Sequence, residues 1–207
     1  MRREYFDQMY AASPDPWGFT DRWYEQRKYG LTLAALTRQR YRSVFEPGCS
    51  IGVLTAQLAL RCDRLLAVDL VDTAVQNARR EVRDLPDGAG DVVVERWDAH
   101  DDWPAASFDL IVVSEMLYYL DPPDARRFMD QAADHLDADG ELLLVHWRER
   151  VPEYPMTGDE AHALAVATRG LETQATYEDD DLVLHLLAPT GAGSTAVREG
   201  LRTASSH

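Results

Sequence analysis

Val44-Phe45-Glu46-Pro47-Gly48-Cys49-Ser50-Ile51-Gly52 is the stretch that decides the fold, and an apolar-periodic run at residues 53–60 follows it. Its first two residues are typical of the end of a buried strand, its glycines bracket a tight turn, and the following run has helical spacing. A glycine in such a turn lets the backbone approach a ligand without a Cβ in the way, and the first N–H groups of the next helix point toward that ligand. The stretch therefore predicts a nucleotide-binding loop between a strand and a helix.

Glu46 indicates which kind of ligand this loop holds. A dinucleotide site of the G-x-G-x-x-G type binds a pyrophosphate, and a carboxylate at the mouth of the loop would repel it. Only Gly48 and Gly52 are present here, so a nicotinamide-dependent oxidoreductase is disfavoured. A ligand with a positive charge would be attracted instead, and the ammonium group of S-adenosylmethionine is such a charge.

At this point the sequence resembles the class I S-adenosylmethionine-dependent methyltransferases. Their first motif runs acidic residue, x, Gly, x, Gly, x, Gly at the end of the first strand, and residues 46–52 match it with Ser50 in place of the middle glycine. A serine is expected to avoid a strongly positive φ, so we expect the backbone of the loop to depart from the family pattern at Ser50.

The composition fits one globular domain with a small-molecule ligand. The chain has 207 residues, 45% of them apolar, and a formal net charge of −15. That charge, with Lys28 as the single lysine, disfavours a nucleic acid as partner. Cys49 and Cys62 form no disulfide framework and have no metal-ligand spacing with the histidines, so we expect no metal and a reduced, cytoplasmic protein. We also expect no export signal and no membrane span.

The beginning of the chain is rich in aromatic residues. Eight of the 19 aromatic residues lie in the first 30 positions. This density predicts a helical cap over residues 1–40 that packs over a site, with a turn at 15–19 and a helix at 22–37, although the rings could equally join a helix to a sheet. The methyltransferase domain is expected at 41–187, and a flexible tail at 188–207.

Strands and helices alternate through the middle of the chain. Strands are predicted at 64–69, 91–96, 108–114 and 140–146, helices at 74–83, 122–136 and 159–169, and a hairpin at 171–177 and 182–187. The family resemblance implies the arrangement of these elements. It is an α/β, Rossmann-like class I methyltransferase fold: a mostly parallel seven-stranded sheet with an antiparallel C-terminal hairpin strand and helices on both faces.

The predicted strand ends carry the candidate cofactor ligands. Asp69 ends a buried strand, where a carboxylate can accept hydrogen bonds from both ribose hydroxyls. The family resemblance implies that Asp98 receives the adenine amine and that the Ala99 amide reaches a ring nitrogen, and Lys28 could reach the cofactor carboxylate. The residues that we expect to bind S-adenosyl-L-methionine are Glu46, Gly48, Cys49, Gly52, Asp69, Leu70, Asp98, Ala99, Ser114 and Lys28.

Five segments narrow the resemblance to the NodS-like methyltransferases. They are Asp15-Pro16-Trp17-Gly18, Trp23-Tyr24-Glu25, the stretch 46–52, Ser114-Glu115-Met116-Leu117-Tyr118-Tyr119 and His146-Trp147-Arg148. The likeness implies N-methylation of a small molecule such as a deacetylated amino sugar, although similar sequences occur far from nodulation, so a chito-oligosaccharide is not implied.

Methyl transfer to an amine needs a neutral lone pair held in line with the sulfonium methyl. Glu115 and His146, both at strand exits, are the candidate catalytic groups that receive the proton or orient the amine. A helix-capping or ion-paired role for Glu115 and a packed role for His146 stay open. Candidate substrate-binding residues are Trp17, Tyr24, Tyr119 and His162, and the aromatic ones could equally belong to the core.

Three functions remain open from the sequence. The first is N-methylation of an amino sugar or natural-product amine, the second is O- or S-methylation of a small metabolite, and the third is a cofactor-binding module without catalysis. The expected partner is a small amine or sugar, with no nucleic acid and no membrane. Whether the chain forms a homodimer also remains open.

Overall fold

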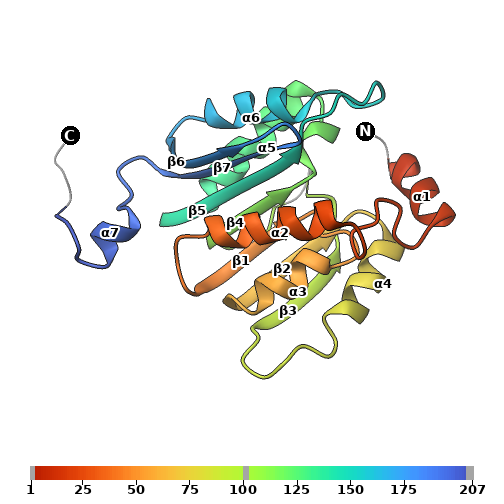
Figure 1. Ribbon diagram of the computed structural model, residues 1–207, viewed down its shortest axis with the longest axis horizontal. Helices are drawn as coiled ribbons and strands as arrows, with labels where there is room; N and C mark the ends of the chain where they lie inside the picture. Colours follow the sequence, from red (N-terminus) through yellow and green to blue (C-terminus); the bar gives the residue numbers. More distant parts are fainter. Residues whose placement is uncertain (1–2, 100–102, 204–207) are drawn as a thin grey trace.

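The computed structural model describes residues 3–99 and 103–203, and Figure 1 shows its layers. One seven-stranded sheet has the order β3-β2-β1-β4-β5-β7-β6. Its strands are β1 (Tyr41–Pro47), β2 (Cys62–Asp69), β3 (Asp91–Arg96), β4 (Phe108–Ser114), β5 (Leu136–Trp147), β6 (Leu171–Glu178) and β7 (Leu182–Pro189). The helices are α1 (Arg3–Ala12), α2 (Trp23–Ala35), α3 (Val53–Ala59), α4 (Asp72–Glu81), η1 (Leu117–Tyr119), α5 (Pro122–Asp134), α6 (Gly158–Val166) and α7 (Thr195–Arg198).

The pairing of the strands confirms the predicted Rossmann-like methyltransferase sheet. Strands β1 to β5 are parallel to their neighbours, whereas β7 lies antiparallel between β5 and β6. The order reverses between β1 and β4, and crevices for ligands open at the carboxyl ends of strands at such a switch point. The topology therefore places the ends of β1, β2, β4 and β5 around one site.

The central strands are buried on both faces because helices cover both sides of the sheet. Ile111 and Val113 of β4 belong to the core under α5 and α6, whereas Leu110 and Val112 pack with residues of α2 and α3 on the other face. Figure 1 shows α2 crossing one face of the sheet in front of β1 and β4. Alternate side chains of β4 therefore enter the core on opposite faces of the sheet, which explains why its sequence is continuously apolar. In contrast, the edge strand β6 is largely exposed and polar.

Several element boundaries differ from the predicted ones. The helix expected to reach residue 136 ends at Asp134, because Leu136 already pairs with Phe108 at the start of β5. The Phe108 amide donates to the His135 carbonyl at 2.9 Å, so the chain joins the sheet before Gly140. The segment expected to be a flexible tail contains α7, and Arg198 in this helix forms an ion pair with Glu141 at 3.2 Å. Residues 204–207 of that segment lie outside the described residues, as do residues 1–2 of the predicted cap.

The segment predicted to form a cap contains α1 and α2, and specific contacts join these helices to the sheet edge. The Tyr10 hydroxyl lies 2.5 Å from Ser50 Oγ in the glycine loop, and the Phe6 ring packs edge-on against Tyr119. On α2, Arg27 forms an ion pair with Asp179 at 2.7 Å, in the turn between β6 and β7. The cap is thus connected to both halves of the sheet.

We predict that Gly52→Ala destabilises the fold much more than Gly88→Ala. Both glycines have a left-handed backbone, with φ of 87° and 89°. A Cβ at Gly52 would lie 2.8 Å from Ala78 Cα, whereas one at Gly88 would meet nothing within 4 Å. A Cβ on a left-handed backbone lowers the free energy of unfolding by about 1–2 kcal/mol, which is the loss we expect for Gly88→Ala. Gly52→Ala also forces the Cβ against Ala78, so we expect a loss of about 3 kcal/mol. Urea unfolding measures both, and equal losses would contradict the close packing of α3 on α4.

Candidate active site

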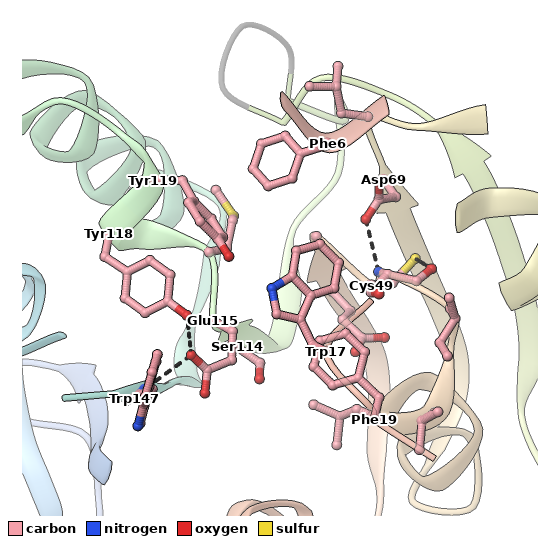
Figure 2. Close-up of a pocket in the computed structure, with 18 of the residues that line it drawn as sticks. Phe6, Trp17, Phe19, Cys49, Asp69, Ser114, Glu115, Tyr118, Tyr119 and Trp147 are labelled. Carbon is pink, nitrogen blue, oxygen red and sulfur yellow. Dashed lines mark hydrogen bonds between the residues drawn. The ribbon is translucent and has the colours of Figure 1, made fainter. Parts of the chain in front are cut away.

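A cavity of about 460 Å³ lies at the carboxyl edge of the sheet, beneath the cap. The ends of β1, β2, β4 and β5 contribute to its lining, together with α1, α2 and η1. Figure 2 shows Asp69 and Glu115 on opposite sides of this cavity, with aromatic rings between and around them. Of the predicted cofactor-binding residues, those that line it are Glu46, Gly48, Cys49, Asp69, Leu70, Asp98, Ala99, Ser114 and Lys28.

The glycine loop after β1 has a left-handed backbone at three positions. Gly48 has φ of 76°, Ser50 of 52° and Gly52 of 87°. The expectation that Ser50 avoids a positive φ is therefore corrected: its amide donates to Asp69 Oδ2 at 2.9 Å, and its hydroxyl lies against Tyr10. These two bonds hold the serine in a conformation that its Cβ alone disfavours.

Gly52 does not line the cavity, which corrects its predicted contact with the cofactor. It is the N-cap of α3, and its Cα faces Ala78 of α4. Its lack of a side chain lets two helices approach each other. Gly48, in contrast, lines the cavity beside Met116, whose side chain would be 3.2 Å from a Cβ at that position.

Asp69 holds the loop in place with both of its carboxylate oxygens. Its Oδ2 accepts from the Ser50 amide and its Oδ1 from the Val71 amide, each at 2.9 Å. Burial raises the pKa of Asp69 to about 6, although these backbone donors oppose the rise. Each oxygen keeps a second lone pair, so the carboxylate can still accept bonds from hydroxyl groups of a ligand.

Glu46 is more enclosed than its place in the motif predicts. Only 2% of its surface is exposed, and its Oε2 accepts from the Thr55 hydroxyl at 2.7 Å. Burial raises the pKa of Glu46 to about 8, which keeps the free group protonated at neutral pH. A ligand ammonium placed beside it would favour the ionised form and lower that pKa.

Glu115 receives hydrogen bonds from three separate segments. Its Oε1 accepts from Lys28 Nζ of α2 at 2.6 Å. Its Oε2 accepts from the Trp147 amide at 3.1 Å and from the Tyr118 hydroxyl, and Figure 2 marks both bonds. Glu115 also has φ of 54°, a conformation that is uncommon for non-glycine residues and costs backbone free energy. The carboxylate is thus fixed at the cavity wall.

Lys28 lies between two carboxylates. Its ammonium is 2.6 Å from Glu115 Oε1 and 2.7 Å from Glu25 Oε2, and its side chain is 1% exposed. Burial alone would lower the pKa of Lys28, but the two neighbouring carboxylates raise it above its ordinary value. This corrects the expectation that Lys28 is available for the cofactor carboxylate, since its charge is already neutralised by the protein.

Trp17, Tyr24 and Tyr119, the predicted aromatic substrate-binding residues, all line the cavity. The Trp17 ring lies between Tyr10, which packs edge-on, and Phe19, which stacks on it at 5.6 Å. The Tyr24 hydroxyl is buried and has no hydrogen-bond partner within the described residues. A buried hydroxyl of this kind favours a ligand that supplies the missing bond.

Neither His146 nor His162 lines the cavity, which corrects two predictions. His146, a predicted catalytic residue, is fully buried, and its Nε2 accepts from the Leu117 amide at 3.0 Å. His162, a predicted substrate-binding residue, is also buried, with Nε2 2.9 Å from His146 Nδ1. Successive side chains of a strand point to opposite faces, so the end of β5 presents Trp147 to the cavity rather than His146.

Sequence analysis missed several residues of the lining. Phe6 and Tyr10 lie four positions apart on α1, and this spacing could have identified the helix face that covers the site. Others lie in the predicted cap or in the segments that carry the family resemblance, without a role assigned to them there; they are Phe19, Arg22, Glu25, Tyr118 and Trp147. Tyr154 is among the lining residues that had no such signal, because only the tertiary fold brings it to the cavity.

Comparison with known proteins agrees with this geometry. A crystal structure of a Pseudomonas syringae protein assigned as a methyltransferase is 43% identical and covers 80% of this chain and 98% of its own, with a TM-score of 0.67. The structure of the N-methyltransferase NodS from Bradyrhizobium japonicum WM9, in complex with S-adenosyl-l-homocysteine, is 23% identical, covers 90% of this chain and 97% of its own, and has a TM-score of 0.80. The fold is that of the class I methyltransferases.

The family model of Nodulation protein S (NodS) matches residues 4–169. The chain belongs to this family. Nodulation protein S of Rhizobium tropici is 30% identical over 119 residues, which is 53% of this chain and 44% of that protein. The chain therefore aligns with less than half of that relative's length.

Two further results concern membranes and metals. None of the helices in the described residues is long and apolar enough to cross a membrane. In the same part of the chain, no group of three or more His, Cys, Asp or Glu residues could hold a metal ion.

We predict that Lys28→Met strongly destabilises the protein. Removing one partner of a buried ion pair leaves uncompensated charge, in this case two carboxylates, and costs about 3–5 kcal/mol. Arg150→Met is the matched control, because the pair of Arg150 with Glu160 is more than half exposed, and such pairs contribute about 1 kcal/mol or less. The free energy of unfolding from urea denaturation measures both. A Lys28→Met loss as small as that of the control would contradict the buried arrangement.

Proposed function

We propose that this chain transfers the methyl group of S-adenosyl-L-methionine to the amine nitrogen of a small molecule. The observation that carries the proposal is the fixed Glu115 carboxylate at the cavity wall, opposite Asp69 and surrounded by aromatic rings. When bound, the cofactor supplies an electrophilic methyl group on a sulfonium centre. The solved NodS relative is described as an N-methyltransferase, and we extend that activity to this chain.

The lining supports S-adenosyl-L-methionine as the cofactor. Asp69 would accept hydrogen bonds from the ribose hydroxyls with its remaining lone pairs. Asp98 and the Ala99 amide, which also line the cavity, would receive the adenine edge. Glu46 would face the ammonium group of the methionine part. Gly48 and Cys49, at the tip of the loop, let the backbone approach the ligand closely.

The charge of the lining favours a basic acceptor. Its acidic residues outnumber its basic ones, Arg22 and Lys28; they are Glu25, Glu46, Asp69, Asp98, Glu115, Asp124 and Asp181. An ammonium ion that enters this cavity is attracted by the negative potential. Aromatic faces also attract the cation, so both effects favour its entry. Methyl transfer needs the neutral amine, and desolvation by the apolar part of the wall opposes the charged form and helps to release its proton.

Glu115 is better suited to orient an amine than to deprotonate a hydroxyl. The carboxylate already accepts from Lys28, Tyr118 and Trp147, and its remaining lone pairs can receive an N–H of the acceptor. A hydroxyl acceptor would need a stronger base, because it is far less acidic than an ammonium ion, and a thiol acceptor would gain nothing from the acidic lining once it is ionised. This difference favours N-methylation over O- or S-methylation, and a catalytic role over a pure binding module. We place the reaction in the cytoplasm, where the free thiols of Cys49 and Cys62 persist.

The proposal predicts that Glu115→Gln lowers kcat/KM for amine methylation about 100-fold, in the range of a lost charge-orienting group. The assay uses S-adenosylmethionine labelled with ¹³C in its methyl group and a panel of amines that includes glucosamine, and detects the N-methyl product by NMR. Affinity for S-adenosylhomocysteine should stay within about twofold, because Glu115 faces the acceptor. Glu153→Gln, which removes an exposed carboxylate beside Tyr154, is the control and should change neither value. Undiminished turnover in Glu115→Gln would overturn the role of Glu115, and absence of transfer to every amine would overturn the proposed function.

The pKa of Asp69 predicts a pH dependence of cofactor binding. Ribose hydroxyls donate to the ionised carboxylate, so binding favours the form that exists above pH 6. Protonation of Asp69 should lower the affinity for S-adenosylhomocysteine up to about tenfold between pH 7 and pH 5, in addition to the decline that Glu46 causes below its free pKa of about 8. Calorimetry on the wild type and on Asp69→Asn separates the two groups, since the variant should bind more weakly and keep only the part of the decline that belongs to Glu46. An identical decline in the variant would exclude Asp69 as its source.

A further inference from the structure

Three histidines from three elements form a continuous chain behind the cavity wall. His146 of β5 lies 2.9 Å from His162 of α6, and His162 Nδ1 lies 2.7 Å from His185 Nδ1 of β7. His146 and His162 are buried, whereas His185 is partly exposed. None of the three lines the cavity. The proposed methyl transfer assigns no role to these three histidines.

The inner end of the chain fixes the hydrogen position on every ring. The Leu117 amide can only donate, so His146 Nε2 accepts its bond and carries no hydrogen. A neutral His146 is then protonated at Nδ1 and donates to His162 Nε2, which leaves the hydrogen of His162 at Nδ1. That hydrogen donates to His185 Nδ1, so the hydrogen of His185 is at Nε2. One direction of bonds satisfies all three contacts.

The chain cannot conduct a proton into the site. Its inner end is a backbone amide, which neither accepts nor releases a proton under these conditions, and no histidine touches the cavity. Its contact is with η1, whose first residue is Leu117 and whose other two residues, Tyr118 and Tyr119, line the cavity. The chain therefore acts on position rather than on proton transfer.

We propose that His146, His162 and His185 are positioning residues that hold the first amide of η1, and with it Tyr118 and Tyr119, at the acceptor side of the cavity. This inference rests on the proposed function in one respect: the proposed function identifies this side of the cavity as the place where the amine binds. Tyr118 connects the histidines to the Glu115 carboxylate, because its ring packs edge-on against His146 while its hydroxyl donates to Glu115. A shift of η1 would thus also disturb the carboxylate.

Charged and titratable groups around the chain determine where acid acts on it. The groups that face it are Lys28 of α2, Glu115 after β4, Tyr118 of η1 and Glu178 of β6. Burial and the positive Lys28 lower the pKa of His146 to about 3, so an added proton does not settle at the inner end. At the outer end, burial lowers the pKa of His185 below its ordinary value, while Glu178 partly opposes this.

Protonation of His185 would break the direction of the chain. A hydrogen on His185 Nδ1 faces the hydrogen on His162 Nδ1, so His162 must change its tautomer. The change passes to His146 and puts a hydrogen on Nε2, opposite the Leu117 amide. The bond that holds η1 is then lost. Acidic pH should therefore loosen η1 from a distance.

The direct test is the position of the hydrogens, measured by ¹⁵N NMR of histidine-labelled full chain bound to S-adenosylhomocysteine. At pH 7.5, His146 and His162 should be protonated at Nδ1 and His185 at Nε2, with each signal assigned from single substitutions. Lowering the pH until the ¹⁵N signals of His185 show that it has taken up a proton should remove these fixed tautomers in the wild type. The same pH should leave them in His185→Asn, whose amide oxygen accepts from His162 without titrating. Protonation of His146 at Nε2 at pH 7.5 would overturn the proposal.

Two substitutions of His162 separate positioning from packing. Gln offers an oxygen near the position of Nε2 and keeps an acceptor for His146, whereas Leu fills the buried space without one. Positioning predicts that His162→Leu lowers kcat for the amine about tenfold, with unchanged affinity for S-adenosylhomocysteine, and that His162→Gln stays within about threefold. Packing alone predicts that Leu is at least as active as Gln, and that result would refute the proposal. If the wild type methylates no amine, the proposed function fails while the tautomer measurement still decides the inference.

Discussion

The ion pair between Lys28 and Glu115 is the interaction on which the site depends. It joins α2 of the cap to the end of β4, and the remaining bonds of Glu115 tie η1 and β5 to the same carboxylate. An ammonium with 1% exposure would be costly to bury alone, but Glu25 on its other side completes its neutralisation. The cap can therefore cover the cavity only in the register that brings Lys28 between its two partners. This register also determines which aromatic rings face a ligand.

A second constraint acts on the opposite side of the cavity. Asp69 accepts from the amides of Ser50 and Val71, so the carboxylate at the end of β2 determines the path of the loop after β1. The parallel sheet makes this possible because the carboxyl ends of β1, β2 and β4 meet at one edge. Asp69 ends β2 and Glu115 follows β4, and these strands lie on either side of β1, so the sheet itself sets the separation of the two carboxylates. The two carboxylates define the ends between which a donor and an acceptor could be aligned.

Much of this arrangement could be predicted from local patterns. The positions of the strands along the chain, the glycine loop and the carboxylate at residue 69 follow from apolar periodicity and from turn residues, which are local properties. The arrangement of the strands in the sheet was implied by the family resemblance. The predictions that the structure corrects depend on tertiary neighbours. The sequence around Lys28 does not show Glu115, which is distant along the chain but pairs with it in the fold. His146 stands at a strand exit, but the alternation of side chains along β5 directs it to the face opposite the cavity. Ser50 adopts a positive φ because its hydrogen bonds with Tyr10 and Asp69 stabilise that conformation. A sequence motif shows neither contact.

A crystal structure of the full chain with S-adenosylhomocysteine tests most directly whether the cavity holds the donor between Asp69 and Glu115. With that placement, both ribose hydroxyls lie within about 3 Å of the Asp69 carboxylate, as hydrogen bonds require, and the sulfur points toward the side that Glu115 and Tyr119 occupy. A nucleoside bound elsewhere, or with its ribose turned away from Asp69, would contradict it.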